Sequence, residues 1–434
     1  MAGNKVYACI DYEDAYVQPL LLQALRARLP PEVLVLINDV SELPSPEAKF
    51  LQWRQYESID FDGLMEQSST CLANSYIIRK ALIRKHYLST TVSHWLTKNP
   101  ESALRKHVKP SIEFEVDFAE FLDDALLEAF ELKESWERNE GKEASEKEWW
   151  ILKPGMSDRG QGIRLFSSEE ELTEIFEEWD PPSDDEEDDD GELSGDEASA
   201  KPSKDDDEET GNGIITSQLR HFIAQPYVHP PLLMPSPHPS AGRKFHIRTY
   251  VLAVGALKVY VYKPMLALFA GQPYAAPSDS SASTNENLSA HLTNTCMQTG
   301  EREGSVHAFW SLPSDTDGIP NEWKDTVFSQ ICTSTSQIFE AAARSMSIHF
   351  QPLPNAFELF GLDFMVDAEG TAFLLEVNAF PDFAQTGEEL QGLVQGLMGE
   401  VVDVAVKPFF GLGMQGQERS EDMIEVLDID LGRR

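Results

Sequence analysis

Apolar positions along the first 70 residues follow a β-α-β pattern. Val6–Ile10 and Val33–Ile37 are short apolar runs that predict buried strands, and the spacing within Val17–Leu29 predicts a helix between them. This order indicates a small α/β lobe that ends near residue 70. Residues 71–90 then alternate apolar and basic positions, which predicts a helix.

The rest of the chain alternates between helical and strand patterns. Phe118–Glu137 predicts an acidic amphipathic helix. Trp149–Lys153 and Ile163–Phe166 flank a Gly-rich turn and predict a hairpin, and Ser168 with Glu171 predicts a capping box for the next helix. Further strands are predicted at Phe222–Gln225, Phe245–Val254, Leu257–Tyr262, Leu359–Val366 and Ala372–Asn378, and long helices at Trp323–Met346 and Glu388–Val406. The mixture indicates an α+β fold with antiparallel hairpins.

Charge is distributed unevenly along the 434 residues. The chain carries 74 acidic and 35 basic residues, a net charge of −39. Asp180–Gly213 holds 16 acidic and two basic residues, so it contributes −14 and the remainder still carries −25. This tract has almost no apolar residues, so we expect it to be disordered. Because an acidic surface repels phosphate, direct nucleic-acid binding is not expected.

Cysteine use and hydropathy indicate an intracellular protein. The four cysteines are widely spaced and contain no CxxC pair, so neither a disulfide framework nor a zinc site is expected. The first residues lack a basic segment followed by an apolar core, and no apolar run is long enough to cross a membrane. We therefore expect a cytosolic or nuclear protein without membrane contact, and a monomer by default.

A predicted hairpin near the C-terminal end brings two carboxyl groups together. A two-residue loop within the turn Asp367–Gly370 places Asp363 opposite Glu376, with Asn378 on the same face. Facing carboxylates repel unless a cation lies between them, and two carboxylates with an amide suit Mg²⁺. Two solvated acids at an exposed edge are the alternative. The opposite face is expected to hold Leu362, Phe364, Val366, Phe373, Leu375 and Val377.

Two further segments carry positive charge or glycine. Strand alternation in residues 243–254 puts Lys244, His246, Arg248 and Tyr250 on one face, which indicates an anion site or a solvated sheet face. The turn between Lys153 and Ile163 contains Gly155, Gly160 and Gly162 but is not a Walker A loop. It fits a lid over phosphates, or an ordinary flexible hairpin. With the metal hairpin, these segments suit phosphoryl transfer from Mg-ATP.

Five ordered motifs resemble the tubulin–tyrosine ligase family. They are WILKPGMSDRGQGI, QPYVHPPLL, RKFHIRTYVL, HLTN and FELFGLDFMVD…LLEVNAFP, and the likeness runs from about residue 70 to 406. The resemblance implies an ATP-grasp fold, with an N-terminal α/β lobe at residues 1–70, a central lobe at 71–227 that contains the 180–213 insert, a C-terminal lobe at 228–412 and a tail at 413–434.

The resemblance also implies roles for individual residues. Contacts with ATP phosphates are implied for Lys80 and Lys153 under the lid that contains Gly160 and Gly162, and adenine contacts for Gln225, Tyr227 and Val228. Lys244 and Arg248 are implied to contact phosphate and the acceptor carboxylate, Thr293 and Asn294 to lie near nucleotide and substrate, and Asp363, Glu376 and Asn378 to bind Mg²⁺. Catalysis is assigned to Arg248, Lys244 and Glu376.

The implied activity is an ATP- and Mg²⁺-dependent ligation of an amino acid, tyrosine by resemblance, to a protein carboxylate such as that of α-tubulin. The sequence departs from the family at two positions: His246 stands where an acid is usual, and Leu268 where an arginine is usual. Two alternatives therefore remain open. One is a ligase with another protein substrate. The other is a ligase-like scaffold beside mRNA-decapping proteins in cytoplasmic P-bodies, where fungal relatives occur. The tail strand Met423–Leu431 is expected to pack on its own domain rather than on a partner.

Overall fold

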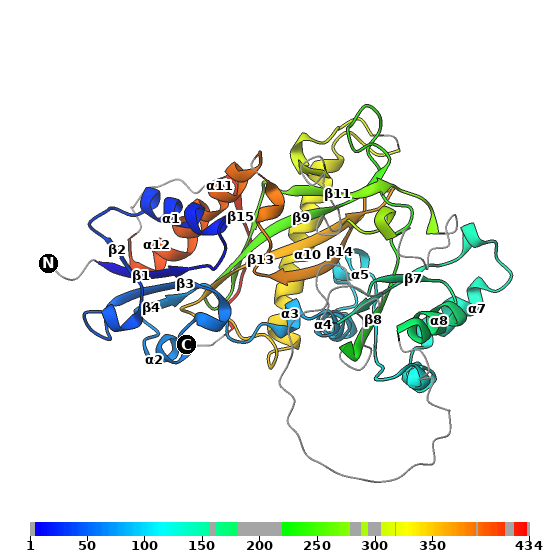
Figure 1. Ribbon diagram of the computed structural model, residues 1–434, viewed down its shortest axis with the longest axis horizontal. Coiled ribbons are helices and arrows are strands. Elements are labelled where there is room, and N and C mark those ends of the chain that lie inside the picture. The colour runs from blue at the N-terminus through cyan, green and yellow to red at the C-terminus, as the bar shows by residue number, and fades with distance from the viewer. Residues whose placement is uncertain are drawn as a thin grey trace, which may run out of the picture.

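The computed structural model describes residues 5–155, 162–179, 219–277, 288–293, 305–316, 318–387, 389–412 and 421–431. Three sheets define three lobes, and the C-terminal lobe lies between the N-terminal and central lobes (Figure 1). No helix in the described ranges is both long and apolar enough to span a membrane. The Asp180–Gly213 tract, for which we predicted disorder, lies outside the described residues.

The N-terminal lobe is a parallel sheet in the order β2-β1-β3-β4. Its elements are β1 (Val6–Asp11), α1 (Val17–Arg28), β2 (Leu34–Ile37), η1 (Val40–Glu42), β3 (Lys49–Arg54), η2 (Tyr56–Ser58), α2 (Phe61–Glu66) and β4 (Cys71–Ala73). The predicted β-α-β start is confirmed. The helix predicted from residue 71 is wrong at its start, because Cys71 pairs with Phe50 of β3 and the Asn74 side chain hydrogen-bonds both the N–H and the C=O of Arg54.

Three helices connect this lobe to the next: α3 (Lys80–Ile83), α4 (Lys85–Lys98) and α5 (Leu104–His107). The central lobe is an antiparallel sheet in the order β5-β8-β6-β7. Its elements are β5 (Ile112–Glu115), η3 (Ala119–Phe121), α6 (Leu122–Ala125), α7 (Phe130–Asn139), η4 (Ala144–Glu146), β6 (Trp150–Pro154), β7 (Arg164–Phe166), α8 (Glu169–Trp179) and β8 (His221–Pro226).

Two predictions for the central lobe have mixed outcomes. The single helix at Phe118–Glu137 is wrong, because non-helical backbone around Ala129 separates α6 from α7, although Leu122 and Leu132 are both buried as the periodicity implied. The capping box at α8 is confirmed in part. The Ser168 hydroxyl accepts from the Glu171 N–H at 3.2 Å, but the Glu171 carboxylate accepts from Ser167 rather than Ser168.

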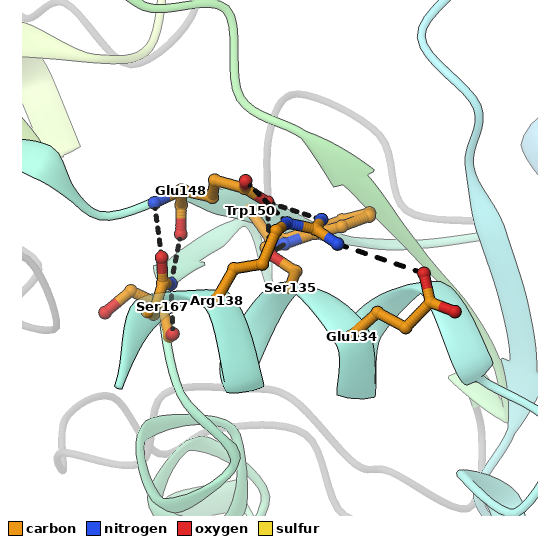
Figure 2. Close-up of polar contacts among 7 residues, drawn as sticks. Glu134, Ser135, Arg138, Glu148, Trp150 and Ser167 are labelled. Carbon is orange, nitrogen blue, oxygen red and sulfur yellow. Dashed lines mark hydrogen bonds and ion pairs between the residues drawn. The ribbon is translucent and has the colours of Figure 1, made fainter. Parts of the chain in front are cut away.

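A polar network fastens the β6–β7 hairpin to α7 (Figure 2). The buried Asn139 side chain accepts from the Glu148 N–H at 2.8 Å and donates to the carbonyls of Glu148 and Ser167 at 2.9 and 3.0 Å. Arg138 donates to both Glu148 carboxylate oxygens, and the Trp150 indole donates to Ser135. The outer ends of β6 and β7 are thus held against α7.

The C-terminal lobe has a seven-stranded sheet in which β12-β11-β9-β10-β15 is one path and β13 pairs with both β9 and β14. Its elements are β9 (Arg243–Val254), β10 (Lys258–Tyr262), β11 (Leu266–Pro273), η6 (Leu288–Ala290), β12 (Val306–Ala308), η9 (Phe309–Ser311), α10 (Trp323–Ser345), β13 (Phe357–Val366), β14 (Ala372–Ala379), η10 (Ala384–Thr386), α11 (Gln391–Val401), the π-helix η11 (Val402–Val406), α12 (Lys407–Phe410) and β15 (Met423–Asp428).

Helices cover both faces of this sheet. The buried side of α10 packs on one face, and α11 packs on the other together with α1 of the N-terminal lobe. The strands predicted here are confirmed, and the predicted Glu388–Val406 helix corresponds to α11 and η11. The tail strand β15 pairs with β10 of its own domain, as expected.

The β13–β14 hairpin confirms the predicted pairing of Asp363 with Glu376, but by a different register at its turn. Asp367 hydrogen-bonds Thr371 around a three-residue loop, in which Gly370 has a φ of +81°. A β-bulge at Leu375 then shifts the register by one residue. The predicted placement of Phe373 and Leu375 is therefore wrong. Both pack with Val228 and Met365, whereas Leu362, Phe364, Val366 and Val377 lie in the core on the α10 side.

Candidate active site

The central and C-terminal sheets enclose a cleft that holds most of the predicted site residues. A cavity of about 80 Å³ lies between β6 and β8 on one side and β9, β13 and β14 on the other. The predicted site residues that line it are Lys153, Gln225, Tyr227, Val228, Lys244, Thr293, Asp363 and Glu376. Five segments far apart in sequence therefore converge on one place.

Strand β9 supplies the cationic side of the cleft. The predicted alternation is confirmed, because Phe245 and Ile247 lie in the core on the α10 side while Lys244 and His246 line the cavity. The Lys244 ammonium donates to the Tyr227 hydroxyl at 2.8 Å and lies 4.0 Å from the centre of its ring. Burial and the neighbouring charge of Lys153 lower the pKa of Lys244 to about 7. A bound anion stabilises the charged form of such a lysine.

A second buried lysine faces Lys244 from the central lobe. The Lys153 ammonium donates to the Gln225 side-chain oxygen at 2.9 Å. Burial lowers the pKa of Lys153 to about 8, although Glu376 opposes this shift. Because both cations are buried without a full complement of acids, the cleft is electrostatically suited to phosphate groups.

Two carboxylates and an amide lie together at the end of the cleft. The Asn378 amide nitrogen is 3.1 Å from a Glu376 carboxylate oxygen and 3.5 Å from an Asp363 oxygen. Burial alone would raise the pKa of Glu376, but Lys85, Lys153 and the Asn378 amide outweigh it and lower the pKa to about 2. The Glu376 side chain keeps 25% of its surface exposed, so solvent and ligands reach it.

Arg248 forms a salt bridge with one of these carboxylates, Asp363. Its guanidinium donates to the two Asp363 oxygens at 2.5 and 3.0 Å, and both side chains are buried. Burial would lower the pKa of Arg248, but Asp363 overrides this effect and raises it. Gly361 leaves room for this pair and for Pro381, since a Cβ there would lie 2.9 Å from the Pro381 Cβ and 3.2 Å from the Arg248 Cδ. Arg248 therefore orients Asp363.

The donor set at Asp363, Glu376 and Asn378 fits Mg²⁺. Each carboxylate oxygen accepts more than one contact, so the Arg248 pair leaves lone pairs of Asp363 available. The Asn378 amide nitrogen faces both carboxylates in this structure, so the side-chain oxygen, a hard ligand, would turn toward the ion by a flip of the amide. No cluster of three or more His, Cys, Asp or Glu side chains suited to a metal occurs within the described ranges, so this mixed set is the candidate.

His246 and Leu268 occupy the two positions where the sequence departs from the family pattern. The His246 Nδ1 is 2.6 Å from the Thr293 hydroxyl, and its Nε2 is 3.7 Å from an Asp363 oxygen. Burial lowers the pKa of His246 and thereby favours its neutral imidazole, although Asp363 opposes the shift. Leu268 pairs with His246 across β9 and β11 and is buried.

Some predicted residues lie outside the cavity or outside the described part of the chain. Lys80 begins α3 with an exposed side chain and does not line the cavity, so its phosphate contact stays a prediction. Gly160 and Asn294 lie outside the described residues, and Gly162 has a φ of +72° at the end of the turn. Lys85 was missed by the sequence reasoning, although its ammonium is 3.8 Å from Glu376.

His291 was also missed, although it lines the cavity and its Nδ1 lies 2.9 Å from the Tyr227 hydroxyl. It belongs to the HLTN motif, from which only Thr293 and Asn294 had been singled out. Burial and the charge of Lys244 lower the pKa of His291 to about 4. His291 therefore stays neutral while it orients the Tyr227 hydroxyl that Lys244 contacts.

Comparison with solved structures identifies the fold. The C-terminal domain from K. lactis Pby1, an ATP-grasp enzyme interacting with the mRNA decapping enzyme Dcp2, is 36% identical to this chain. The similarity covers 98% of this chain and 99% of that one, with a TM-score of 0.70. The fold and the cleft therefore define this chain as an ATP-grasp protein. The sequence model of the tubulin-tyrosine ligase family matches residues 66–411, so the chain belongs to that family.

Curated relatives extend this similarity. A probable tubulin–tyrosine ligase of Schizosaccharomyces pombe is 44% identical over 94% of this chain and 92% of its own length. The probable tubulin–tyrosine ligase PBY1 of Saccharomyces cerevisiae is 42% identical over 98% of this chain, which spans only 55% of that protein. A polyglycylase, TTLL10 of mouse, is 27% identical over 60% of this chain. Relatives of the chain thus carry names for different amino acids.

Proposed function

We propose that the chain is an ATP- and Mg²⁺-dependent ligase that joins an amino acid to a carboxylate of a protein. The observation that carries this proposal is the cleft in which two buried lysines with lowered pKa values, Lys153 and Lys244, face the carboxylates Asp363 and Glu376. An anion with a bound divalent cation satisfies both sides of this cleft at once.

The residues divide the work by their position and charge. Lys153 and Lys244 bind the phosphates, while Gln225, Tyr227 and Val228 form the adenine side of the cleft. Asp363, Glu376 and Asn378 would hold Mg²⁺, which would supply neutralisation of the phosphate charge. Arg248 keeps Asp363 in place and presents positive charge beside the reacting carboxyl group.

The proposed reaction has two steps. A carboxylate oxygen of the acceptor attacks the γ-phosphorus of ATP, the bond to the β-phosphate oxygen breaks, and ADP and an acyl phosphate form. The neutral amine of the amino acid then attacks the acyl carbon, phosphate leaves, and the amine loses a proton as the amide forms. Holding both reactants in one cleft supplies the proximity that the second step needs.

Nucleotide binding and ligation test this function separately. Mg-ATP should raise the melting temperature of the chain, whereas ATP with EDTA should raise it less, because the carboxylates then repel the phosphates. Incubation with labelled tyrosine, glutamate or glycine and a protein lysate should label an acceptor in an ATP-dependent reaction. If Mg-ATP leaves the melting temperature unchanged, the chain does not bind the nucleotide and the proposed reaction is contradicted.

A second candidate function is a ligase-like scaffold, or a ligase with a non-tubulin substrate, that associates with mRNA-decapping proteins. It is favoured by the buried Leu268 at a position where the family pattern has an arginine, and by the reported interaction of the K. lactis Pby1 domain with Dcp2. Cytoplasmic P-bodies are the location that this function implies. A scaffold binds a purified decapping enzyme with equal affinity when Glu376 is replaced by Gln, and labels no acceptor.

A further inference from the structure

A second cavity adjoins the proposed nucleotide cleft. It encloses about 300 Å³ beside α4 and the sheet of the central lobe, which lie side by side in Figure 1. Leu88, Val92 and Leu96 of α4 form an apolar wall, and the segment after α5 contributes Lys109. The volume is in the range of small-molecule binding sites.

A short chain of hydrogen bonds separates the two cavities. Lys153 donates to the Gln225 side-chain oxygen at 2.9 Å, and the Gln225 amide donates to the Ser111 hydroxyl at 3.3 Å. Lys153, Gln225 and Leu375 line both cavities, whereas Ser111 lines only the second. The second cavity is therefore a separate chamber with a shared wall.

The charge of this chamber runs against the composition of the chain. Acids outnumber bases 74 to 35 in the sequence, yet the charged lining consists of four cations (Lys85, Arg105, Lys109 and Lys153) and one acid, Glu131. Within the described ranges, Arg105 and Lys109 form no ion pair with an acid. Arg105 donates to the Pro100 carbonyl, and Lys109 lies 4.5 Å from the Phe373 ring centre. Arg105 is exposed and Lys109 is half-buried, so this positive charge lies at the solvent side of the apolar wall and favours a ligand that combines both chemistries.

We propose that this chamber binds a small ligand with an anionic group and an apolar body while nucleotide occupies the adjoining cleft. The anionic group, a carboxylate or a phosphate, contacts Arg105 and Lys109. The apolar body packs on Leu88, Val92 and Leu96. The proposal rests on the proposed function only in taking the adjoining cleft as the nucleotide site.

Calorimetric titration of the full chain tests the proposal with defined probes. The chain is first saturated with Mg²⁺ and a non-hydrolysable ATP analogue, and phenyl phosphate or phenylacetate is then added. At least one of these probes should bind, and the better of the two identifies the anionic group. Inorganic phosphate, which lacks the ring, and benzyl alcohol, which lacks the charge, should each bind at least about tenfold more weakly.

Matched variants locate the site. Arg105→Gln and Lys109→Gln should each weaken the probe about tenfold or more, because each removes a charged hydrogen-bond donor. Lys106→Gln should leave binding unchanged, since Lys106 is exposed next to Arg105 but does not line the chamber. Ser93→Trp, on the exposed side of α4, should block the chamber without altering charge.

Three results would contradict the proposal that the chamber binds such a ligand. They are binding of neither probe, displacement of the probe by the ATP analogue, and an equal loss of affinity in Lys106→Gln. Binding of the analogue alone is measured in the same wild-type protein. If the analogue does not bind, the proposed function is contradicted. The probe titration without nucleotide then still tests whether the chamber binds a ligand.

Discussion

Replacing Lys244 by Met should stabilise the ligand-free protein and weaken nucleotide binding. The ammonium is buried, its hydrogen bond goes to the neutral Tyr227 hydroxyl, and Lys153 is the charge that lowers its pKa after burial. Methionine has a similar length and no charge to desolvate. The variant therefore removes a cost that the folded protein bears for the sake of an anion.

The pH dependence gives the size of this cost. The pKa of Lys244 is about 7 in the folded protein and 10.5 when unperturbed. Because the folded pKa is the lower one, the unfolded state binds more protons between these values, and stability rises with pH across that window. Integrated from pH 7 to pH 9, this single group contributes about 2 kcal/mol of increasing stability.

Urea denaturation at pH 7 and pH 9 measures that difference in wild type and variant. Lys244→Met should lose about 2 kcal/mol of the pH-dependent gain and be the more stable protein at pH 7. Lys98→Met, at an exposed position of α4, should behave as wild type. Mg-ATP affinity should fall at least about tenfold in Lys244→Met, and wild-type affinity should decrease as pH rises above 7. A variant with the wild-type pH slope, or with unchanged affinity, refutes the assignment of Lys244.

Three other substitutions test separate parts of the site. Glu376→Gln should reduce ligation about 10²–10³-fold and also lower the melting temperature, because the ionised carboxylate stabilises Lys85 and Lys153, and unchanged turnover in the folded variant would contradict its metal-binding role. Asn139→Ala should destabilise the chain by about 2–3 kcal/mol by leaving three backbone groups unpaired, as read from urea denaturation. Its control Glu134→Ala should cost less than about 0.5 kcal/mol because that ion pair is exposed, and equal losses would refute the network of Figure 2. Gly361→Ala should displace Pro381 and Arg248 and lower turnover without abolishing nucleotide binding, whereas wild-type turnover would show that both neighbours tolerate a Cβ there.

Local patterns sufficed wherever a side chain's direction follows from a regular element. Alternation along β9 located Lys244, His246 and Arg248 on one face, and the structure has this arrangement. The hairpin likewise brought Asp363 opposite Glu376. The pairing was predicted correctly although the loop was predicted one residue too short. The register shift from the longer loop is reversed by the bulge at Leu375 before the strands reach the two acids. Loop length and bulges depend on packing with residues distant in sequence. The two-residue alternation of side chains along a strand contains no information about that packing.

Long-range partners were beyond the sequence pattern. Nothing near Lys85 in the chain indicates that it approaches Glu376, since almost 300 residues separate them. Arg248 was expected to await a substrate carboxylate, yet its partner in this structure is Asp363. The strand Cys71–Ala73 was taken as helix because its edge pairing with β3 supplies what three residues cannot show alone.

The exchange at position 246 alters the charge balance of the cleft rather than its shape. Lys85, Lys153 and Arg248 lie near the carboxylates of Asp363 and Glu376, Lys244 with its pKa of about 7 is about half protonated at pH 7, and burial lowers the pKa of His246. An acid at 246, as in the family pattern, would offset part of this positive charge. With histidine the cleft keeps a net positive charge among these residues, so it favours an additional negative charge on whatever binds beside the phosphates. Specificity of this chain is therefore expected to differ from that of family members with an acid there.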